Sequence, residues 1–144
     1  MKVVVNFISV LLLFGLITTP IYFAQNFTKV AGVKSHSPYL IISQIEKFPN
    51  LTFSQNGENY TINYTTLGPS QAFLGILILS NPTEKTQTYN LDTTPGGTKL
   101  FFGKEIKNQQ TKISIPSQLS VPISLLSEGN SSESKTVVFT ISVE

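Results

Sequence analysis

Short runs rich in β-branched and aromatic residues alternate with turn-forming residues along most of the chain. Thr136–Val143 is the clearest of these runs, because every second residue from Val137 onward is apolar, as in a strand with one buried face. The run from Ala72 to Leu79 is almost wholly apolar and predicts a central strand with a deeply buried face. Gly and Pro mark the breaks between runs, where they favour turns. The pattern predicts an all-β fold.

Nine runs qualify as strands, and many short strands separated by turns are typical of a β-sandwich. We therefore expect an immunoglobulin-like β-sandwich over residues 48–144, preceded by a hydrophobic signal helix and an extended segment. The predicted strands are Tyr39–Ile45, Leu51–Phe53, Tyr60–Thr66, Ala72–Ser80, Thr86–Asp92, Lys99–Phe102, Thr111–Ile115, Leu119–Leu126 and Thr136–Val143.

Residues 1–24 have the layout of a secretory signal peptide. Lys2 supplies one positive charge, the stretch from Val3 to Ile17 is mostly apolar, and Thr18-Thr19-Pro20 breaks the helix. A cut after Ala24 makes Gln25 the new N-terminus. The same stretch is just long enough to cross a bilayer as an uncleaved anchor, so that alternative stays open. Either way, we expect the protein outside the cell or on its surface.

The charge composition argues against nucleic acid as a partner. Charged residues make up 12% of the chain, the net charge is +2, and all ten basic residues are Lys. Nucleic-acid interfaces use clustered positive charge, commonly with Arg, and neither is found here. The chain also has no Cys, which removes disulfides and thiolate chemistry.

Sequons for N-glycosylation recur along the chain, and behind an export signal they are open to modification. Asn81-Pro82-Thr83 is excluded by its Pro. Two of the sequons, at Asn59 and Asn63, are four residues apart in one strand-like run, so their side chains should share a face that cannot be part of a core. The five predicted glycosylation sites are Asn26, Asn50, Asn59, Asn63 and Asn130.

No catalytic or metal-binding constellation emerges from the sequence. His36 is the one His and lies in a polar stretch, where we expect an exposed linker residue. The acidic residues are scattered and mostly in turns, so no paired carboxylates stand out. Gly96-Gly97 lacks the residues of a phosphate loop and is better explained by a hairpin turn. We expect neither an enzyme nor a cofactor.

Four aromatic residues have two interpretations. They can pack in the core, as Tyr and Phe commonly do in half-buried strands, or they can form a platform for sugar. Core packing is the favoured interpretation. The four residues are Tyr60, Tyr64, Phe101 and Phe102.

Several short motifs resemble those of bacterial and archaeal immunoglobulin-like surface domains. An asparagine turn follows a strand at Leu79-Ser80-Asn81-Pro82-Thr83, and Pro95-Gly96-Gly97 marks a turn. The segments Ser120-Val121-Pro122-Ile123-Ser124-Leu125 and Val138-Phe139-Thr140-Ile141-Ser142-Val143 complete the likeness. It covers roughly half of the chain, from Phe73 to Val143. The resemblance implies the fold and a surface location and says little about activity.

Residues 25–47 form a segment of their own, in which an irregular stretch is followed by the apolar run Tyr39–Ile45. Such a detached strand is either the first strand of its own sandwich or a donor strand that completes the sheet of another copy. As a donor, its partner-binding residues are Tyr39, Leu40, Ile41, Ile42 and Ile45.

The combination of an export signal, a small immunoglobulin-like domain, sequons, absent Cys and a candidate donor strand resembles the subunits of archaeal thread-type surface filaments. That resemblance implies a glycosylated extracellular homopolymer assembled by strand addition, with N-linked glycans and other copies of the chain as partners. The membrane is then a partner only through the first segment, if it stays uncleaved. The alternative is a secreted or membrane-anchored binding module for sugar or for a partner protein.

Overall fold

The computed structural model describes residues 37–144 of the chain, and these residues form one compact unit. All nine predicted strands are present in it, with ends shifted by a few residues. They are β1 (Leu40–Ser43), β2 (Leu51–Asn56), β3 (Asn59–Thr65), β4 (Ser70–Ser80), β5 (Gln87–Thr93), β6 (Thr98–Phe102), β7 (Lys112–Ile115), β8 (Ser120–Glu128) and β9 (Ser134–Val143).

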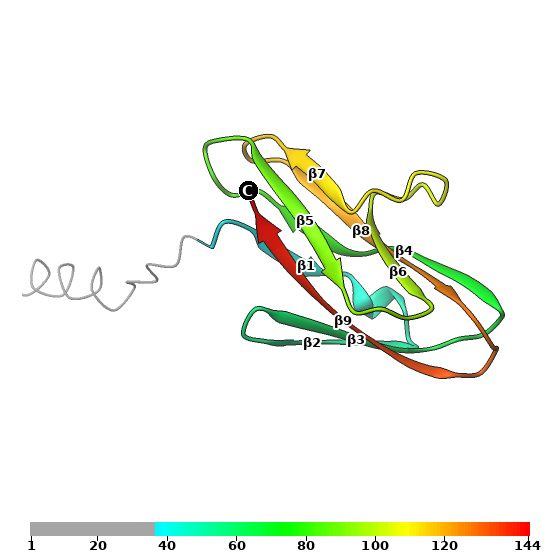
Figure 1. Ribbon diagram of the computed structural model, residues 1–144. Helices are drawn as coiled ribbons and strands as arrows, with labels where there is room; N and C mark the ends of the chain where they lie inside the picture. The colour runs from blue at the N-terminus through cyan, green and yellow to red at the C-terminus, as the bar shows by residue number, and fades with distance from the viewer. Residues whose placement is uncertain (1–36) are drawn as a thin grey trace, which may run out of the picture. The chain divides into compact units, whose positions relative to one another are not determined.

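The strands form two antiparallel sheets that pack face to face, which confirms an all-β sandwich (Figure 1). The sheet that we call sheet A has the order β1-β4-β8-β6, and sheet B has the order β2-β3-β9-β5-β7. Within residues 37–144, consecutive strands pair directly only in the β2–β3 hairpin. All the other connections cross from one sheet to the other, so the two layers are tied together many times.

The core lies between the sheets and follows the alternation of the strands. Tyr60, Ile62 and Tyr64 of β3 point inward and are buried, while the residues between them point outward. Tyr64 of sheet B meets Phe73 of sheet A edge to face, with ring centroids 5.6 Å apart. Burial of such side chains is the main favourable term in folding, so the two inner faces hold the domain together.

Asn81 is a polar residue inside this core, only 1% exposed. Its side-chain amide donates to the carbonyl oxygens of Lys85, Ile115 and Pro116, and its side-chain oxygen accepts from the N–H of Thr83. These bonds connect the end of β4 to the end of β7. A buried amide is tolerated because every polar atom has a partner. The asparagine of the turn that the sequence indicated therefore stabilises the contact between these two strand ends.

Two local expectations were wrong. Pro95-Gly96-Gly97 does not close a hairpin, because β5 belongs to sheet B and β6 to sheet A. A side chain at Gly97 would put its Cβ 2.6 Å from the carbonyl oxygen of Glu128, so this crossing needs a glycine. Ile45 is not part of a strand either, since it opens the 3₁₀ turn η1 (Ile45–Lys47) that carries the chain from β1 toward β2.

The predicted signal segment 1–24 and the residues up to 36 lie outside the described residues. In the part of the chain that the structure describes, η1 is the one helical element, and no helix is long or apolar enough to cross a membrane.

Candidate interaction surface at the β1 edge and the outer face of sheet A

β1 is an edge strand of four residues, and it pairs antiparallel with β4 of its own chain. Leu40 lies opposite Ser80, and Ser43 lies opposite Leu77. Leu40 and Ile42 point outward and are 54% and 43% exposed. Edge strands present one row of unpaired backbone groups and are the places where sheets can be extended or exchanged.

The inward side chains of the β1 segment enter the space between the two sheets. Tyr39 and Ile41 pack against the core cluster. The Tyr39 ring meets Tyr89 of sheet B edge to face at 6.3 Å, and the Tyr60 hydroxyl donates to the Tyr39 hydroxyl at 3.3 Å. The Tyr89 hydroxyl donates to the carbonyl oxygen of Pro38 at 2.7 Å. This segment therefore closes one side of the sandwich.

Burial raises the pKa of both phenols that receive the β1 segment. For Tyr60, desolvation is the largest cause, and the hydrogen bond to Tyr39 adds to it. For Tyr89, desolvation is the cause. Both phenols are therefore neutral over the physiological pH range, as their position in the partly apolar slot between the two sheets requires.

The chain leaves β1 through η1, which is anchored at both of its ends. The N–H of Gln44 donates to the carbonyl oxygen of Ile76 at 2.8 Å and so extends the ladder between β1 and β4. Phe48 then packs edge to face on Phe73 at 6.1 Å. Among the predicted donor residues, Tyr39 and Ile41 thus face the core, Leu40 and Ile42 face outward, and Ile45 packs against the core from η1.

A bulge in β4 shapes the outer face of sheet A. The pairing of β4 with β8 skips between Phe73 and Leu77, and Gly75 has a positive φ of 68°. A side chain at Gly75 would put its Cβ 2.9 Å from Cε of Lys104, so the lysine stem lies across the glycine. A single glycine inside an apolar strand pattern is a known signal of a bulge, and it could have indicated this feature from the sequence.

Beside the bulge is a hollow of about 400 Å³ that sequence analysis missed. Lys47 and Phe48 line it from the η1 side, Lys104 lines it from the β6–β7 loop, and Ile78 and Pro122 line it from the sheet. No ion pair formed within residues 37–144 includes either lysine. The hollow therefore combines apolar side chains with two ammonium groups that form no ion pair in the part of the chain that the structure describes.

Elsewhere on the outer side of sheet A, two outward side chains are buried. Phe101 and Leu126 alternate with core residues and so point outward, yet they are 0% and 7% exposed. The Ser124 hydroxyl donates to the carbonyl oxygen of Gly103 at 2.5 Å and accepts from the N–H of Gly75 at 2.9 Å. Ser124 thus fastens the start of the β6–β7 loop to the bulge.

The predicted glycosylation sites lie elsewhere. Asn59 and Asn63 are both exposed on the outward side of β3, as their even spacing predicts. The Thr136 hydroxyl of β9 donates to the side-chain oxygen of Asn63 at 2.6 Å. Asn50 is exposed just before β2, and Asn26 lies outside the described residues.

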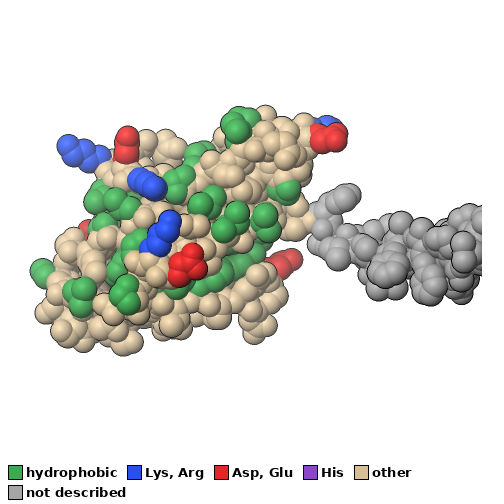
Figure 2. All heavy atoms as spheres, turned by 180° about the vertical axis from the view of Figure 1, so that it is seen from behind, with side chains coloured by type: hydrophobic (Ala, Val, Ile, Leu, Met, Phe, Trp, Pro, Cys, Tyr) green, Lys and Arg blue, Asp and Glu red, His purple; other side chains and the backbone are tan. Residues whose placement is uncertain are grey.

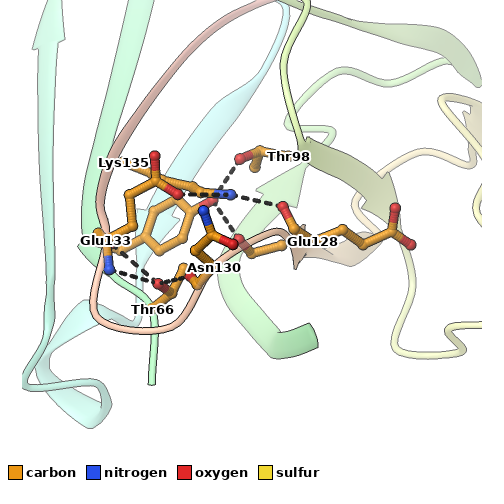
Figure 3. Close-up of polar contacts among 8 residues, drawn as sticks. Thr66, Thr98, Glu128, Asn130, Glu133 and Lys135 are labelled. Atoms are coloured by element: carbon orange, nitrogen blue, oxygen red, sulfur yellow. Dashed lines mark hydrogen bonds and ion pairs between the residues drawn. The ribbon is translucent and has the colours of Figure 1, made fainter. Parts of the chain in front are cut away.

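Asn130 is exposed in the β8–β9 turn, whose backbone is held by a polar cluster (Figure 3). The Thr66 hydroxyl donates to the carbonyl oxygen of Asn130 at 2.7 Å and accepts from the N–H of Glu133 at 3.0 Å. The Lys135 ammonium donates to the carbonyl oxygen of Glu128 at 2.7 Å. Because the cluster uses the backbone of Asn130, its side-chain amide stays accessible at a fixed turn.

The remaining sequence candidates are structural. Tyr60, Tyr64 and Phe102 are buried in the core between the sheets, and Phe101 is buried on the outer side of sheet A, so these side chains pack inside the domain and do not form a sugar platform. The Tyr64 hydroxyl bonds the hydroxyls of Thr98 and Ser127 inside the sandwich. His36 lies outside the described residues. Within residues 37–144, no three His, Asp or Glu side chains gather where they could hold a metal ion.

Comparisons with known proteins give no family. No family model matches the chain, and no curated protein does. Among solved structures, it is similar to the crystal structure of a FixG-related protein from Vibrio parahaemolyticus. That similarity has 16% sequence identity and a TM-score of 0.32, and it covers 74% of this chain and 94% of that one. A likeness at this level carries no argument about function.

Proposed function

We propose that this chain is an exported structural subunit, an immunoglobulin-like domain glycosylated on its asparagine sequons, that forms an extracellular filament by strand exchange. β1 of one copy occupies the β4 edge of the next copy in place of that copy's own β1. The first 24 residues direct export. The protein has no enzymatic role in this proposal.

The observation that carries the proposal is the way in which β1 is held. It is a short edge strand whose ladder contacts are all with β4, and its inward side chains fill a slot between Tyr60 and Tyr89. A strand from another copy can make the same backbone bonds to β4 and fill the same space between the two tyrosines, so the contacts of β1 itself are kept on exchange. Because such a contact joins different surfaces of successive copies, it repeats without closing and produces a fibre.

A pair of engineered cysteines tests where β1 pairs. Ile42 and Ile78 lie opposite each other in β1 and β4, and the chain has no native Cys to interfere. Directly opposed antiparallel residues are within the Cα separation that a disulfide spans. In the double variant Ile42→Cys/Ile78→Cys, mild oxidation of the exported protein should give a ladder of covalently linked subunits on a non-reducing gel.

The matched control is Thr88→Cys/Ser114→Cys. These residues lie opposite each other in β5 and β7, with their hydroxyl oxygens 2.9 Å apart, and neither strand takes part in exchange. This control should form its disulfide within one chain and run as a monomer. If the β1–β4 pair also closes only within single chains, strand exchange is wrong.

A second test removes the strand. Deletion of residues 25–47 leaves the β4 edge and the slot between the sheets open, so the truncated domain should have a lower melting temperature. A peptide spanning Tyr39–Ile45 added in trans should restore part of that temperature. A peptide with Ile41→Pro should not, because proline lacks the ladder donor. Full stability of the truncated domain without peptide would count against the proposal.

The alternative function is a binding module for sugar or a partner protein, and the hollow beside Gly75 is the observation that favours it. Apolar walls with a few fixed polar groups are the usual lining of a ligand site. Under this alternative the exported protein is a monomer whose β1–β4 disulfide closes in cis. The cysteine experiment therefore separates the two functions.

A further inference from the structure

The hollow beside Gly75 carries charge of one sign. Its charged lining residues are Lys47 and Lys104, and no acidic side chain is among the residues that line it. Glu46 and Glu105 are the chain neighbours of these lysines, yet both lie outside the lining. Figure 2 shows this side of the molecule, on which basic, acidic and hydrophobic side chains are interspersed. The hollow is therefore a local concentration of positive charge on a face of mixed charge.

Neighbouring groups position both ammonium groups at the hollow. The Lys47 ammonium donates to the side-chain oxygen of Gln44 at 2.6 Å. The Lys104 stem crosses Gly75, with its Cε 2.9 Å from the place that a Cβ at this glycine would take. The N–H of Gly103, the residue before Lys104, donates to a carbonyl oxygen of β8 at 2.7 Å and holds the start of the loop on sheet A. Groups that are positioned before a ligand arrives lose less freedom on binding it.

Most of the remaining lining is apolar. Ile78 of β4 and Pro122 of β8 lie opposite each other in the ladder and line the hollow from the sheet. Phe48 lines it from the η1 side, and Leu74, which is 39% exposed, lines it from β4. An ammonium group has hydrogen-bond donors and no acceptor, so the two charged groups require an acceptor with negative charge. The hollow thus offers cations beside a hydrophobic surface.

We propose that the hollow binds a small amphipathic anion, with one anionic head group on an alkyl or aryl body. The head group bonds to the ammonium groups of Lys47 and Lys104, and the apolar body lies on Ile78 and Pro122. The volume of about 400 Å³ is within the range of about 300–1,000 Å³ that is typical of small-molecule sites. A neutral sugar would leave both charges without a counterion, and an organic cation would be repelled.

The chain's own N-terminal segment does not have the chemistry of this ligand. Residues 1–36 contain three Lys and no Asp or Glu, so they offer the hollow no side-chain anion. The ligand therefore has to come from outside the chain. Because both lysines are exposed and the hollow opens to solvent, we expect a dissociation constant on the order of one millimolar, and weaker binding at high salt.

This inference names the ligand class of the hollow that favours the binding-module alternative, and it does not depend on strand exchange. The hollow can be formed with η1 of the same chain or with η1 of a neighbouring copy. The cysteine ladder therefore tests only the filament, and ligand binding tests only the hollow.

The experiment is saturation-transfer NMR of the exported protein, which detects the ligand and works for a monomer and a filament alike. Octanoate should bind about fivefold more tightly than octan-1-ol, which has the same body without the charge, and octylammonium should bind most weakly. In Lys47→Met/Lys104→Met, which keeps both apolar stems, the advantage of octanoate over octan-1-ol should disappear. Octyl sulfate, compared with octanoate, identifies the preferred head group.

Two further variants separate the parts of the site. Ile78→Thr should weaken octanoate and octan-1-ol alike, by about threefold, because it removes apolar surface and leaves the charges. Lys85→Met is the charge control in the exposed β4–β5 loop and should leave octanoate binding unchanged. Melting temperatures establish that every variant is folded.

The proposal is wrong if octanoate and octan-1-ol bind the unaltered protein equally, if octanoate does not bind at millimolar concentration, or if Lys85→Met lowers its affinity as much as the double lysine variant does. Loss of octanoate selectivity in that double variant, whether or not the cysteine ladder forms, assigns the anion to the hollow.

Discussion

The two outer faces of the sandwich differ in chemistry although the same backbone geometry builds them. On sheet B, the outward residues of β3 and β9 are Asn, Thr and Ser with one valine, Val138. On sheet A, the outward residues of β4 and β8 include Leu74, Ile78, Pro122 and Leu126. A strand in which polar and apolar residues alternate has one polar face that can lie in solvent. A strand that is apolar on both faces needs other residues to cover its outer face as well.

That cover is visible on part of sheet A and missing on the rest. The outward residues Phe101 and Leu126 are buried, whereas Leu74 is 39% exposed. The face therefore divides into a region that the chain covers itself and a region that is open to a partner. Sheet B needs no cover, because hydroxyl and amide groups can bond to water and sequon asparagines can carry sugar.

The largest expected effect on stability comes from shortening an apolar side chain on each outer face to alanine. Phe101→Ala should lower the free energy of unfolding by about 3–5 kcal/mol, because the ring is fully buried and its loss leaves a cavity. Val138→Ala, the matched truncation on sheet B, should cost less than about 1 kcal/mol, since Val138 is half-buried. Denaturant unfolding measures both changes. Equal losses would show that the two outer sides are covered alike.

The strands could be predicted from the sequence, and their arrangement could not. All nine runs form strands because alternation and turn residues act locally. The choice of partner strand depends on contacts far apart in the chain, so Pro95-Gly96-Gly97 was expected to close a hairpin. The burial of Phe101 is equally remote from local pattern, because it depends on what covers the outer side of sheet A.

The candidate surface was only partly predictable. The apolar run at Tyr39–Ile45 predicted a strand, which the structure forms over Leu40–Ser43, and even spacing predicted the shared exposed face of Asn59 and Asn63. The hollow was missed because Lys47, Gly75 and Lys104 lie in separate segments that only the fold brings together. Gly75 carried the one local signal, a glycine within an apolar strand.

A smaller effect is expected from removing sugar on sheet B. We predict that at least three of the five sequons carry glycans. Asn63→Gln should then lower the mass of the exported protein by one glycan. The free energy of unfolding should change by no more than about 0.5 kcal/mol, because Asn63 is exposed.

Intact-protein mass spectrometry and thermal unfolding measure these two quantities, and Asn90→Gln serves as the control on the same face outside any sequon. A mass equal to that of the bare polypeptide before mutation would refute glycosylation. A large loss of stability in Asn63→Gln alone would show that the polar face has a packing role as well.

The smallest effect concerns acid. Within residues 37–144, three carboxylates form ion pairs, those of Glu128, Glu133 and Glu144, and each is more than half exposed. Exposed pairs contribute little, because water and salt screen them. The hydrogen bond from Lys112 is the largest cause that lowers the pKa of Glu144, and a bond from Asn90 adds to it.

The sign of the expected pH dependence follows from that shift. A carboxylate whose pKa is lower in the folded state stabilises the fold above its unfolded pKa and loses this contribution as pH falls through the folded value. We therefore expect a melting temperature that is nearly constant from neutral pH to about pH 5 and falls only slightly in stronger acid. In Lys112→Met, NMR titration should show the pKa of Glu144 moving back up, and the variant and the unaltered protein should approach equal stability in acid. A melting temperature that collapses between about pH 5 and pH 3 would mean that buried or strongly coupled carboxylates hold the sandwich together, and the two faces would then differ less in their electrostatics than their side chains indicate.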